Sequence, residues 1–207
     1  MGVRADDQPW PSAGDREVLA ARRRILDADP DCVQQLPGSE AIVAEVAPSG
    51  LHALAVDQPD DVCLLAPAPG WPLVAGAVLF PSHWHLRDKV GRPAAEVHGR
   101  VPGYPSGQVD RFLDRLRPGK AMWRRNVLFH RNGELYAPEP TAGDEWWVRS
   151  ERQTLRRLPG TGAVLFTIAT DTAPVASLPP GDRRRLADWI AGLPSEWATY
   201  ARVDVAE

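Results

Sequence analysis

Side chains that can bind a metal, a proton or an anion gather in one stretch of the chain, residues 80–104, FPSHWHLRDKVGRPAAEVHGRVPGY. The stretch holds three of the five histidines and one of the two lysines: His83, His85, His98 and Lys89. An apolar run, 73–80, leads into it, and an amphipathic helix pattern, 108–117, follows it. Because loops held by a rigid scaffold concentrate binding and catalytic residues, we expect a small-molecule site here. These residues leave open whether the site holds a metal or a cofactor.

The histidines in this stretch are compatible with two kinds of site. His83 and His85 stand two residues apart, so on a strand both side chains face one side and could share a metal ion. The alternative is a pair of polar residues at the end of a strand, since no HExxH motif or nearby carboxylate completes a facial triad. His98 ends a short helix pattern beside Gly99, where a flat ligand could approach the backbone closely. A purely structural histidine is the alternative there.

Three arginines occupy strand patterns in which a charge needs a partner: Arg125, Arg149 and Arg152. Arg125 interrupts an otherwise apolar strand face, and the pattern at 147–154 is polar on both faces. An unpaired buried charge is costly, so each guanidinium should have a partner. One explanation is an internal ion pair with Glu151, Glu134 or Asp144. The other is recognition of a ligand carboxylate or phosphate, which suits the planar guanidinium fork.

Composition restricts the class of protein. With 207 residues and 43% hydrophobic content, we expect one domain with a sizeable core over 15–207, after a loose tail at 1–14. A net charge of −3 without a basic block gives no reason to expect nucleic-acid binding. The sequence has no signal-peptide pattern, and no apolar run reaches the roughly 20 residues that span a membrane. Cys32 and Cys63 form no metal-like or disulfide pattern, so we expect a cytoplasmic protein.

The spacing of apolar residues predicts alternating groups of helices and strands. Helices are predicted from the Asp15 cap to about residue 28, over 93–98, over 108–117 with Ser106 as cap, after the Asp182 cap, and from Pro194. Strands are predicted over 62–66, 72–80, 121–129, 147–154 and 164–170, the second of them central and buried. Asn132-Gly133 predicts a hairpin to 134–137, and 41–47 and 51–56 fit either short strands or a broken helix. Antiparallel strands with helices grouped between them indicate a single α+β domain.

Several longer motifs point to a family. The segment FPSHWHLRDKVGRPAAEVH, followed by VPGY, RRNV, RSERQTLRRLP and TGAVLFTI, resembles the α subunit of haem-dependent oxidative N-demethylases. The resemblance covers about residues 62–177, a little over half of the chain. Two departures are visible: Val127 follows the Arg-Asn pair where the family pattern has Trp, and the N-terminal part is short for the family.

The resemblance implies a haem b held in a PAS-like α+β fold. It implies a monooxygenase that demethylates a small secondary amine with O2, using electrons from a separate reductase subunit. The residues expected to bind the cofactor are His98, Lys89, Trp84, Tyr104, Arg125 and Arg152, with His98 as the ligand to the iron. Glu151 and Arg149 are the candidate catalytic residues, and Glu151 would hold the protonated amine. The haem supplies the oxidation, and the protein supplies the axial ligand and the orientation of the substrate.

Other ligands and other functions compete with this interpretation. His52 lies outside the matched motifs, His130 borders the predicted turn, and a thiolate from Cys63 is disfavoured in an apolar strand. A haem-binding PAS-like sensor or carrier without turnover is the main functional alternative, because a fold does not fix a function. A non-haem metalloprotein that uses His83 and His85 is the third.

Overall fold

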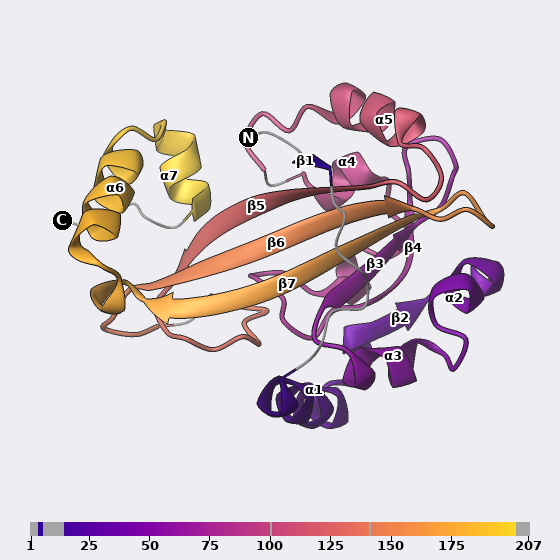
Figure 1. Cartoon of the computed structure of the whole chain (residues 1–207), viewed down its shortest axis with the longest axis horizontal. Coiled ribbons are helices and arrows are strands. Elements are labelled where there is room, and N and C mark those ends of the chain that lie inside the picture. The colour runs from indigo at the N-terminus through magenta and orange to yellow at the C-terminus, as the bar shows by residue number, and fades with distance from the viewer. Residues whose placement is uncertain (1–3, 6–14, 100, 141, 202–207) are drawn as a thin grey trace.

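Three long antiparallel strands form the centre of the molecule: β5 (Ala121–His130), β6 (Trp147–Arg157) and β7 (Val164–Pro174). They belong to a computed structural model that describes residues 4–5, 15–99, 101–140 and 142–201. β6 pairs with β5 on one side and with β7 on the other over almost its whole length. Figure 1 shows the three strands running across the molecule.

Four shorter strands complete one seven-stranded sheet in the order β1-β5-β6-β7-β3-β4-β2. They are β1 (Arg4–Ala5), β2 (Val33–Gln35), β3 (Asp61–Leu65) and β4 (Leu73–Ala77). Every pairing within the sheet is antiparallel, so the predicted α+β class is confirmed. Of the predicted N-terminal tail, the structure describes Arg4–Ala5, which pair with β5, and the rest lies outside the described residues.

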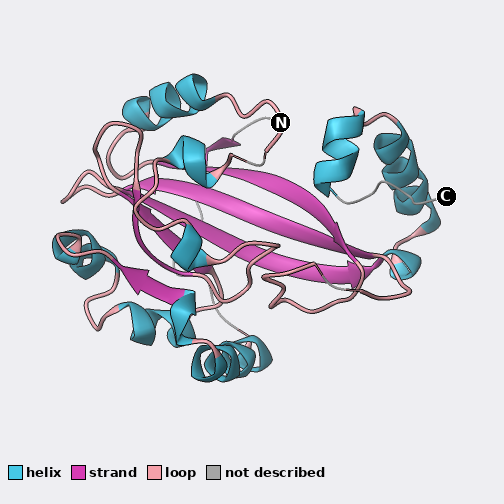
Figure 2. Ribbon diagram, turned by 180° about the vertical axis from the view of Figure 1, so that it is seen from behind, coloured by secondary structure: helices cyan, strands magenta, loops and turns pink. Residues whose placement is uncertain are grey.

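Helices cover both faces of the sheet. Helices α1 (Arg16–Ala28), α2 (Glu40–Val46) and α3 (Leu51–Asp57) pack with β3 and β4 around one apolar cluster that contains Val43, Leu51 and Leu64. Helices α4 (Ala94–Val97) and α5 (Ser106–Arg115) pack around a second cluster with Leu113, Met122 and Leu155. Seen from behind, α4 crosses in front of the sheet (Figure 2).

The C-terminal helices cover the far end of β5 and β6. Helices α6 (Pro180–Ala191) and α7 (Ser195–Ala201) pack in one cluster with Phe129, α6 through Leu186 and Ile190 and α7 through Ala198 and Ala201. Short 3-10 turns η1 (Pro30–Cys32), η2 (Leu86–Asp88) and η3 (Val175–Ser177) complete the described elements. None of the helices in the described part of the chain is both long and apolar enough to cross a membrane.

Local sequence signals placed most elements correctly. The Asp15 carboxylate accepts a hydrogen bond from Glu17 N at 2.8 Å and so caps α1 as predicted. The two ambiguous segments at 41–47 and 51–56 form the helices α2 and α3. Two predicted caps were wrong, because Ser106 lies inside α5 and Asp182 inside the first turn of α6. In both cases a proline, Pro105 or Pro179, stands at the boundary.

β4 ends at Ala77, before the predicted end at Phe80, because of a buried carboxylate. Asp61 accepts hydrogen bonds from the backbone N–H groups of Leu79 at 2.8 Å and Phe80 at 2.9 Å. These donors are therefore taken from the strand ladder. Arg22 of α1 pairs with Asp61 at 2.8 Å, and both side chains are fully buried.

The hairpin predicted at Asn132-Gly133 is not formed. The end of β5 pairs instead with β6, because Phe129 and His130 are the cross-strand partners of Val148 and Trp147. Glu134 N donates to Asn132 Oδ1 at 3.1 Å, which closes a local turn. The chain then runs to Ala137, which bridges Ser82 in parallel orientation.

Candidate functional site

The imidazole of His98 lies just after α4 with one ring nitrogen engaged. Nδ1 is 2.8 Å from the carbonyl oxygen of Ala94, one turn earlier in the chain. A carbonyl oxygen can only accept, so Nδ1–H donates and the lone pair lies on Nε2. A histidine that ligates a metal is usually oriented by such a hydrogen bond from the ring nitrogen that does not bind the metal.

Two further features act on His98: a stacked aromatic ring orients it, and burial keeps it neutral. Tyr104 stacks on it with ring centroids 4.6 Å apart and planes 2° apart. Burial disfavours the charged imidazolium and lowers the pKa of His98 below its ordinary value of 6.5. The charges of Arg124 and Lys89 also lower the pKa of His98, while the hydrogen bond to Ala94 raises it. The ring is therefore an uncharged donor of an electron pair at neutral pH.

Lys89 and Trp84 support α4 from the preceding loop. Lys89 Nζ donates to the carbonyl oxygen of Val97 at 2.9 Å, next to His98. Trp84 packs with Val97 against a core cluster that includes Leu73. Both predicted cofactor residues thus lie near the helix that carries His98, and both contact its supporting elements.

A row of polar side chains crosses β5 and β6 on one face of the sheet. Arg124 and Asn126 of β5 are the cross-strand partners of Gln153 and Glu151 of β6. Arg124 Nε donates to Gln153 Oε1 at 2.8 Å, and Gln153 Nε2 donates to Glu151 Oε2 at 2.9 Å. Asn126 Nδ2 also donates to Glu151 Oε2, at 3.3 Å. We call these four residues the polar row.

Arg149 anchors the end of the polar row. Its Nε donates to Glu151 Oε1 at 3.1 Å, in an ion pair whose arginine side chain is fully buried. The rest of the guanidinium donates to the carbonyl oxygens of Leu135 and Phe80 and to the hydroxyl of Thr170. The internal ion pair considered from the sequence is therefore present. Arg149 positions Glu151 and ties β6 to the start of the 80–104 stretch.

Arg125 and Arg152 lie on the opposite face of the sheet from the polar row. They are cross-strand partners of each other, and side chains alternate between faces along a strand. Arg125 is exposed and donates to Ser150, whereas Arg152 lies over the ring of Trp123 at 4.9 Å. The structure thus separates these two predicted cofactor residues from the polar row.

Arg124 lies on the face that α4 and α5 cover, as do Arg149 and Arg157 of β6. It follows Met122 by two residues, so both side chains share a face, and Met122 packs in the cluster with Ala94 and Leu113. The charge of Arg124 acts on the ionisation of His98 and of Tyr104. The one sequence signal for Arg124 is the alternation of β5, which places Arg124 and Arg125 on opposite faces without telling which face is covered.

The remaining histidines of the stretch have protein partners. His83 stacks on His130 with centroids 4.6 Å apart, and His130 Nε2 is 2.9 Å from the hydroxyl of Ser82. His85 pairs with Glu139 at 3.1 Å. In the described residues, no three His, Cys, Asp or Glu side chains are grouped so that they could hold a metal ion. His83 and His85 therefore do not share one side of a strand, and each contacts a different partner.

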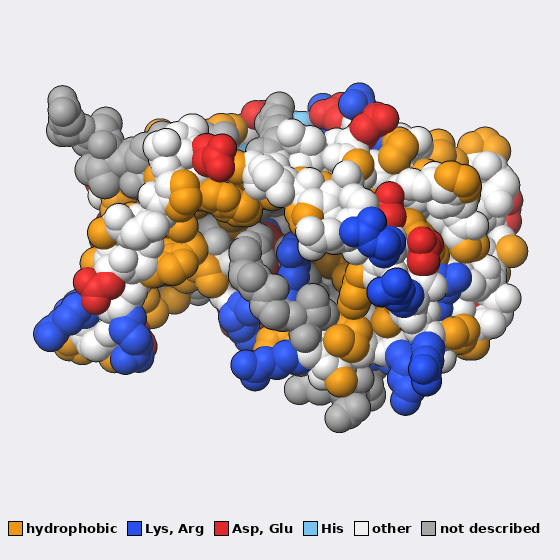
Figure 3. All heavy atoms as spheres, turned by 90° about the horizontal axis from the view of Figure 1, so that it is seen from above, with side chains coloured by type: hydrophobic (Ala, Val, Ile, Leu, Met, Phe, Trp, Pro, Cys, Tyr) orange, Lys and Arg blue, Asp and Glu red, His pale blue; other side chains and the backbone are white. Residues whose placement is uncertain are grey.

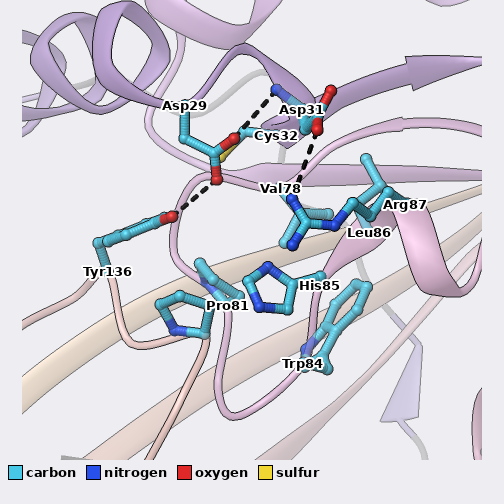
Figure 4. A pocket seen from close by; sticks show the side chains of 11 residues that line it. Asp29, Asp31, Cys32, Val78, Pro81, Trp84, His85, Leu86, Arg87 and Tyr136 are labelled. Atoms are coloured by element: carbon cyan, nitrogen blue, oxygen red, sulfur yellow. Dashed lines mark hydrogen bonds and ion pairs between the residues drawn. The ribbon is translucent and has the colours of Figure 1, made fainter.

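A small pocket lies beside His85 and Trp84, in a different place from His98 (Figure 4). Two pairs of its polar groups are bonded to each other: the hydroxyl of Tyr136 donates to Asp29 at 2.7 Å, and Arg87 donates to Asp31 at 3.4 Å. Burial raises the pKa of the Cys32 thiol in its wall to about 12. The pocket therefore presents a thiol that stays protonated at neutral pH.

The surface is also hollowed between the lobe formed by α6 and α7 and the body that carries α5 (Figure 3). Lys and Arg side chains gather around this hollow. From α7, Tyr200 comes close enough to the polar row for its pKa to respond. Burial is the largest cause and raises the pKa of Tyr200. The charge of Glu151 raises this pKa further, and the charge of Arg124 lowers it.

The comparison with known families agrees with the motifs around His98. A sequence model described as haem-dependent oxidative N-demethylase, alpha subunit-like, matches residues 46–207. The chain belongs to this family. The match begins at the last residue of α2 and includes His98, Tyr104 and the whole polar row. No curated protein matches the chain.

The residues present fit a haem of the kind that the family name implies. His98 offers an uncharged Nε2, whose ring orientation is set by Ala94 and Tyr104. The two cysteines do not offer a competing thiolate, because burial raises the pKa of both Cys32 and Cys63. Histidine is a common axial ligand of haem iron.

Proposed function

We propose that this protein is the haem-binding subunit of an oxygenase that removes a methyl group from a small amine. The single observation that carries the proposal is the state of His98. Its Nδ1 is occupied by Ala94, its ring is stacked on Tyr104, and its lowered pKa keeps Nε2 free of a proton. This is the arrangement expected of an axial haem ligand.

When bound, haem b would supply the oxidising chemistry. The overall reaction consumes an N-methylamine, O2, two electrons and two protons, and it yields the demethylated amine, formaldehyde and water. The two electrons would come from a separate reductase subunit, in keeping with the family name, which describes an alpha subunit. Lys89 and Trp84 would act in this scheme by holding α4 and therefore His98.

The polar row would bind the amine. Glu151 is buried, and its two carboxylate oxygens accept hydrogen bonds from Arg149, Asn126 and Gln153. A carboxylate fixed in this way can accept a hydrogen bond from a protonated amine and orient its methyl group. Arg149 is proposed as a positioning residue that keeps Glu151 in place.

The topology supports the PAS-like part of the proposal. Strands β4-β3-β7-β6-β5 are neighbours in that order, and α4 and α5 lie between β4 and β5 in the sequence. Both helices pack on the sheet face that carries Met122 and Leu155. A PAS-like domain places its ligand between such helices and the sheet, which is where His98 and the polar row lie in this proposal.

Turnover separates an enzyme from a haem sensor or carrier. The haem-loaded protein is supplied with a chemical reductant, O2 and a set of small secondary N-methylamines, and formaldehyde and the demethylated amine are measured. Equal amounts of both products, lost in Glu151→Gln, support the proposal. Haem binding without product from any of the amines contradicts the demethylase and supports the sensor or carrier.

A further inference from the structure

We infer that Arg124 binds a carboxylate of the ligand held by His98, which for haem is a propionate. The inference rests on the proposed function, because it assumes that His98 ligates haem. It assigns to Arg124 the role that the sequence suggested for Arg125 and Arg152. Three observations support it: the fixed orientation of the side chain, its charge balance and its position on the sheet.

The guanidinium of Arg124 is oriented through one of its nitrogens. Nε donates to Gln153 Oε1 at 2.8 Å, and the amide of Gln153 is itself fixed by its bond to Glu151 at 2.9 Å. Within the described residues, the two Nη groups make no hydrogen bond to the protein. The side chain is therefore held at its base while its outer donors remain able to bind a ligand. A guanidinium fork of this kind matches the two oxygens of a carboxylate.

The charge of Arg124 has no carboxylate partner among the described residues. The acidic group of the polar row, Glu151, is paired with Arg149 at 3.1 Å. Arg124 is also half-buried, so water compensates its charge only in part. An anionic ligand group would supply the missing partner, since a partly desolvated cation gains most from a charged hydrogen-bond acceptor.

Arg124 lies on the sheet face against which the helix preceding His98 packs, and not on the opposite face. Met122, on the same face of β5, packs in one cluster with Ala94, the residue whose carbonyl oxygen holds the imidazole. Arg124 is the next residue of β5 on this face. Arg125 points to the other face and bonds Ser150. The neighbouring arginine is therefore a matched control from the same strand.

The test removes the charge in two ways: from residue 124 by substitution, and from the ligand by esterification of its propionates. Wild type, Arg124→Met and Arg125→Met are titrated with haem and with haem dimethyl ester, whose propionates carry no charge, and the Soret absorbance gives the affinities. We expect Arg124→Met to bind haem about 10- to 100-fold more weakly than wild type, the range for a lost charged hydrogen bond. Its affinity for the dimethyl ester should match that of wild type. Arg125→Met should match wild type for both ligands.

The possible failures are distinguishable. Equal haem affinity of Arg124→Met and wild type overturns the inference and leaves the proposed function intact. An equal loss for haem and for its dimethyl ester also overturns it, because Arg124 then supports the fold and not a carboxylate. Arg124→Lys, which keeps the charge, should recover part of the affinity for haem alone. If wild type binds neither ligand, the proposed function fails, and this inference fails with it.

Discussion

The rings of His98 and Tyr104 lie parallel, with planes 2° apart and centroids 4.6 Å apart. His98 ends α4 and Tyr104 lies in the loop that leads into α5, so the stack joins the two helices that cover one sheet face. Because Nδ1 is already bonded to Ala94, the stack fixes the remaining freedom of the ring. Orientation of the imidazole is thus shared between a backbone carbonyl and an aromatic neighbour.

Replacing Tyr104 with Leu should weaken haem binding while leaving the ligand in place. Aromatic stacking contributes about 0.5–1.5 kcal/mol beyond burial, so the affinity should fall roughly 2- to 13-fold. Tyr104→Phe keeps the stack and should bind haem as wild type does. A Soret titration of the two variants measures the difference. Equal affinities of Tyr104→Leu and Tyr104→Phe would show that the stack does not orient His98.

The lowered pKa of His98 predicts a pH dependence of stability. The unfolded chain takes up the proton near the ordinary value of 6.5, whereas the folded chain takes it up only at a lower pH. The contribution of His98 to stability is therefore complete above pH 6.5 and is lost as the pH falls through the folded pKa. Urea unfolding of the haem-free protein at pH 7 and pH 5 should show a smaller loss in His98→Gln than in wild type. An equal loss in both proteins would argue that burial does not hold the ring neutral.

The buried pair of Arg22 and Asp61 should be a major source of stability. Asp61→Asn leaves the fully buried Arg22 without its carboxylate, which should cost about 3–5 kcal/mol. The exposed pair of Arg87 and Asp31, 3.4 Å apart, is the matched control, and Asp31→Asn should cost less than about 1 kcal/mol. Urea denaturation gives both free energies. Similar costs at the two sites would mean that burial does not distinguish the pairs.

The apolar stripe of α5 predicts a graded response to truncation. Leu113 is buried, and Leu113→Ala should cost about 2–5 kcal/mol. Phe112 is only half-buried, so Phe112→Ala should cost about 2 kcal/mol, less than the 3–5 kcal/mol of a fully buried ring. Arg111→Ala, at an exposed position of the same helix, should change stability by no more than about 0.5 kcal/mol. A larger loss in Arg111→Ala than in Leu113→Ala would contradict the packing of α5.

The sequence predicted the long strands and the position of His98 because their signals are local. Alternation marks β5 and β7, and Pro93 with Gly99 brackets α4. The end of β4 could not be predicted, since it depends on Asp61, which lies 18 residues before Leu79 in the sequence and accepts its N–H. The unformed hairpin after Gly133 also depends on a more distant segment, because the end of β5 pairs with β6, which begins at Trp147.

The partners of the site arginines could not be predicted from local sequence signals either. Alternation alone separates Arg124 from Arg125, but it does not tell which strand face the later helices cover. That choice depends on α4 and α5 packing against Met122 and Leu155, a contact between distant parts of the chain. For Arg149 the sequence pattern allowed either an ion pair or a ligand site, and the structure has its donors on Glu151, Leu135 and Phe80.

The absorption spectrum of the haem-loaded protein tests the central claim most directly. Ferric, ferrous and ferrous CO spectra are compared for wild type, His98→Gly, and His98→Gly with added imidazole. His52→Ala, at an exposed position of α3, serves as the control. We predict histidine-ligated spectra for wild type and His52→Ala, loss of the axial-ligand bands in His98→Gly, and their return with imidazole. Unchanged axial-ligand bands in His98→Gly without imidazole would contradict the assignment of His98 as the haem ligand.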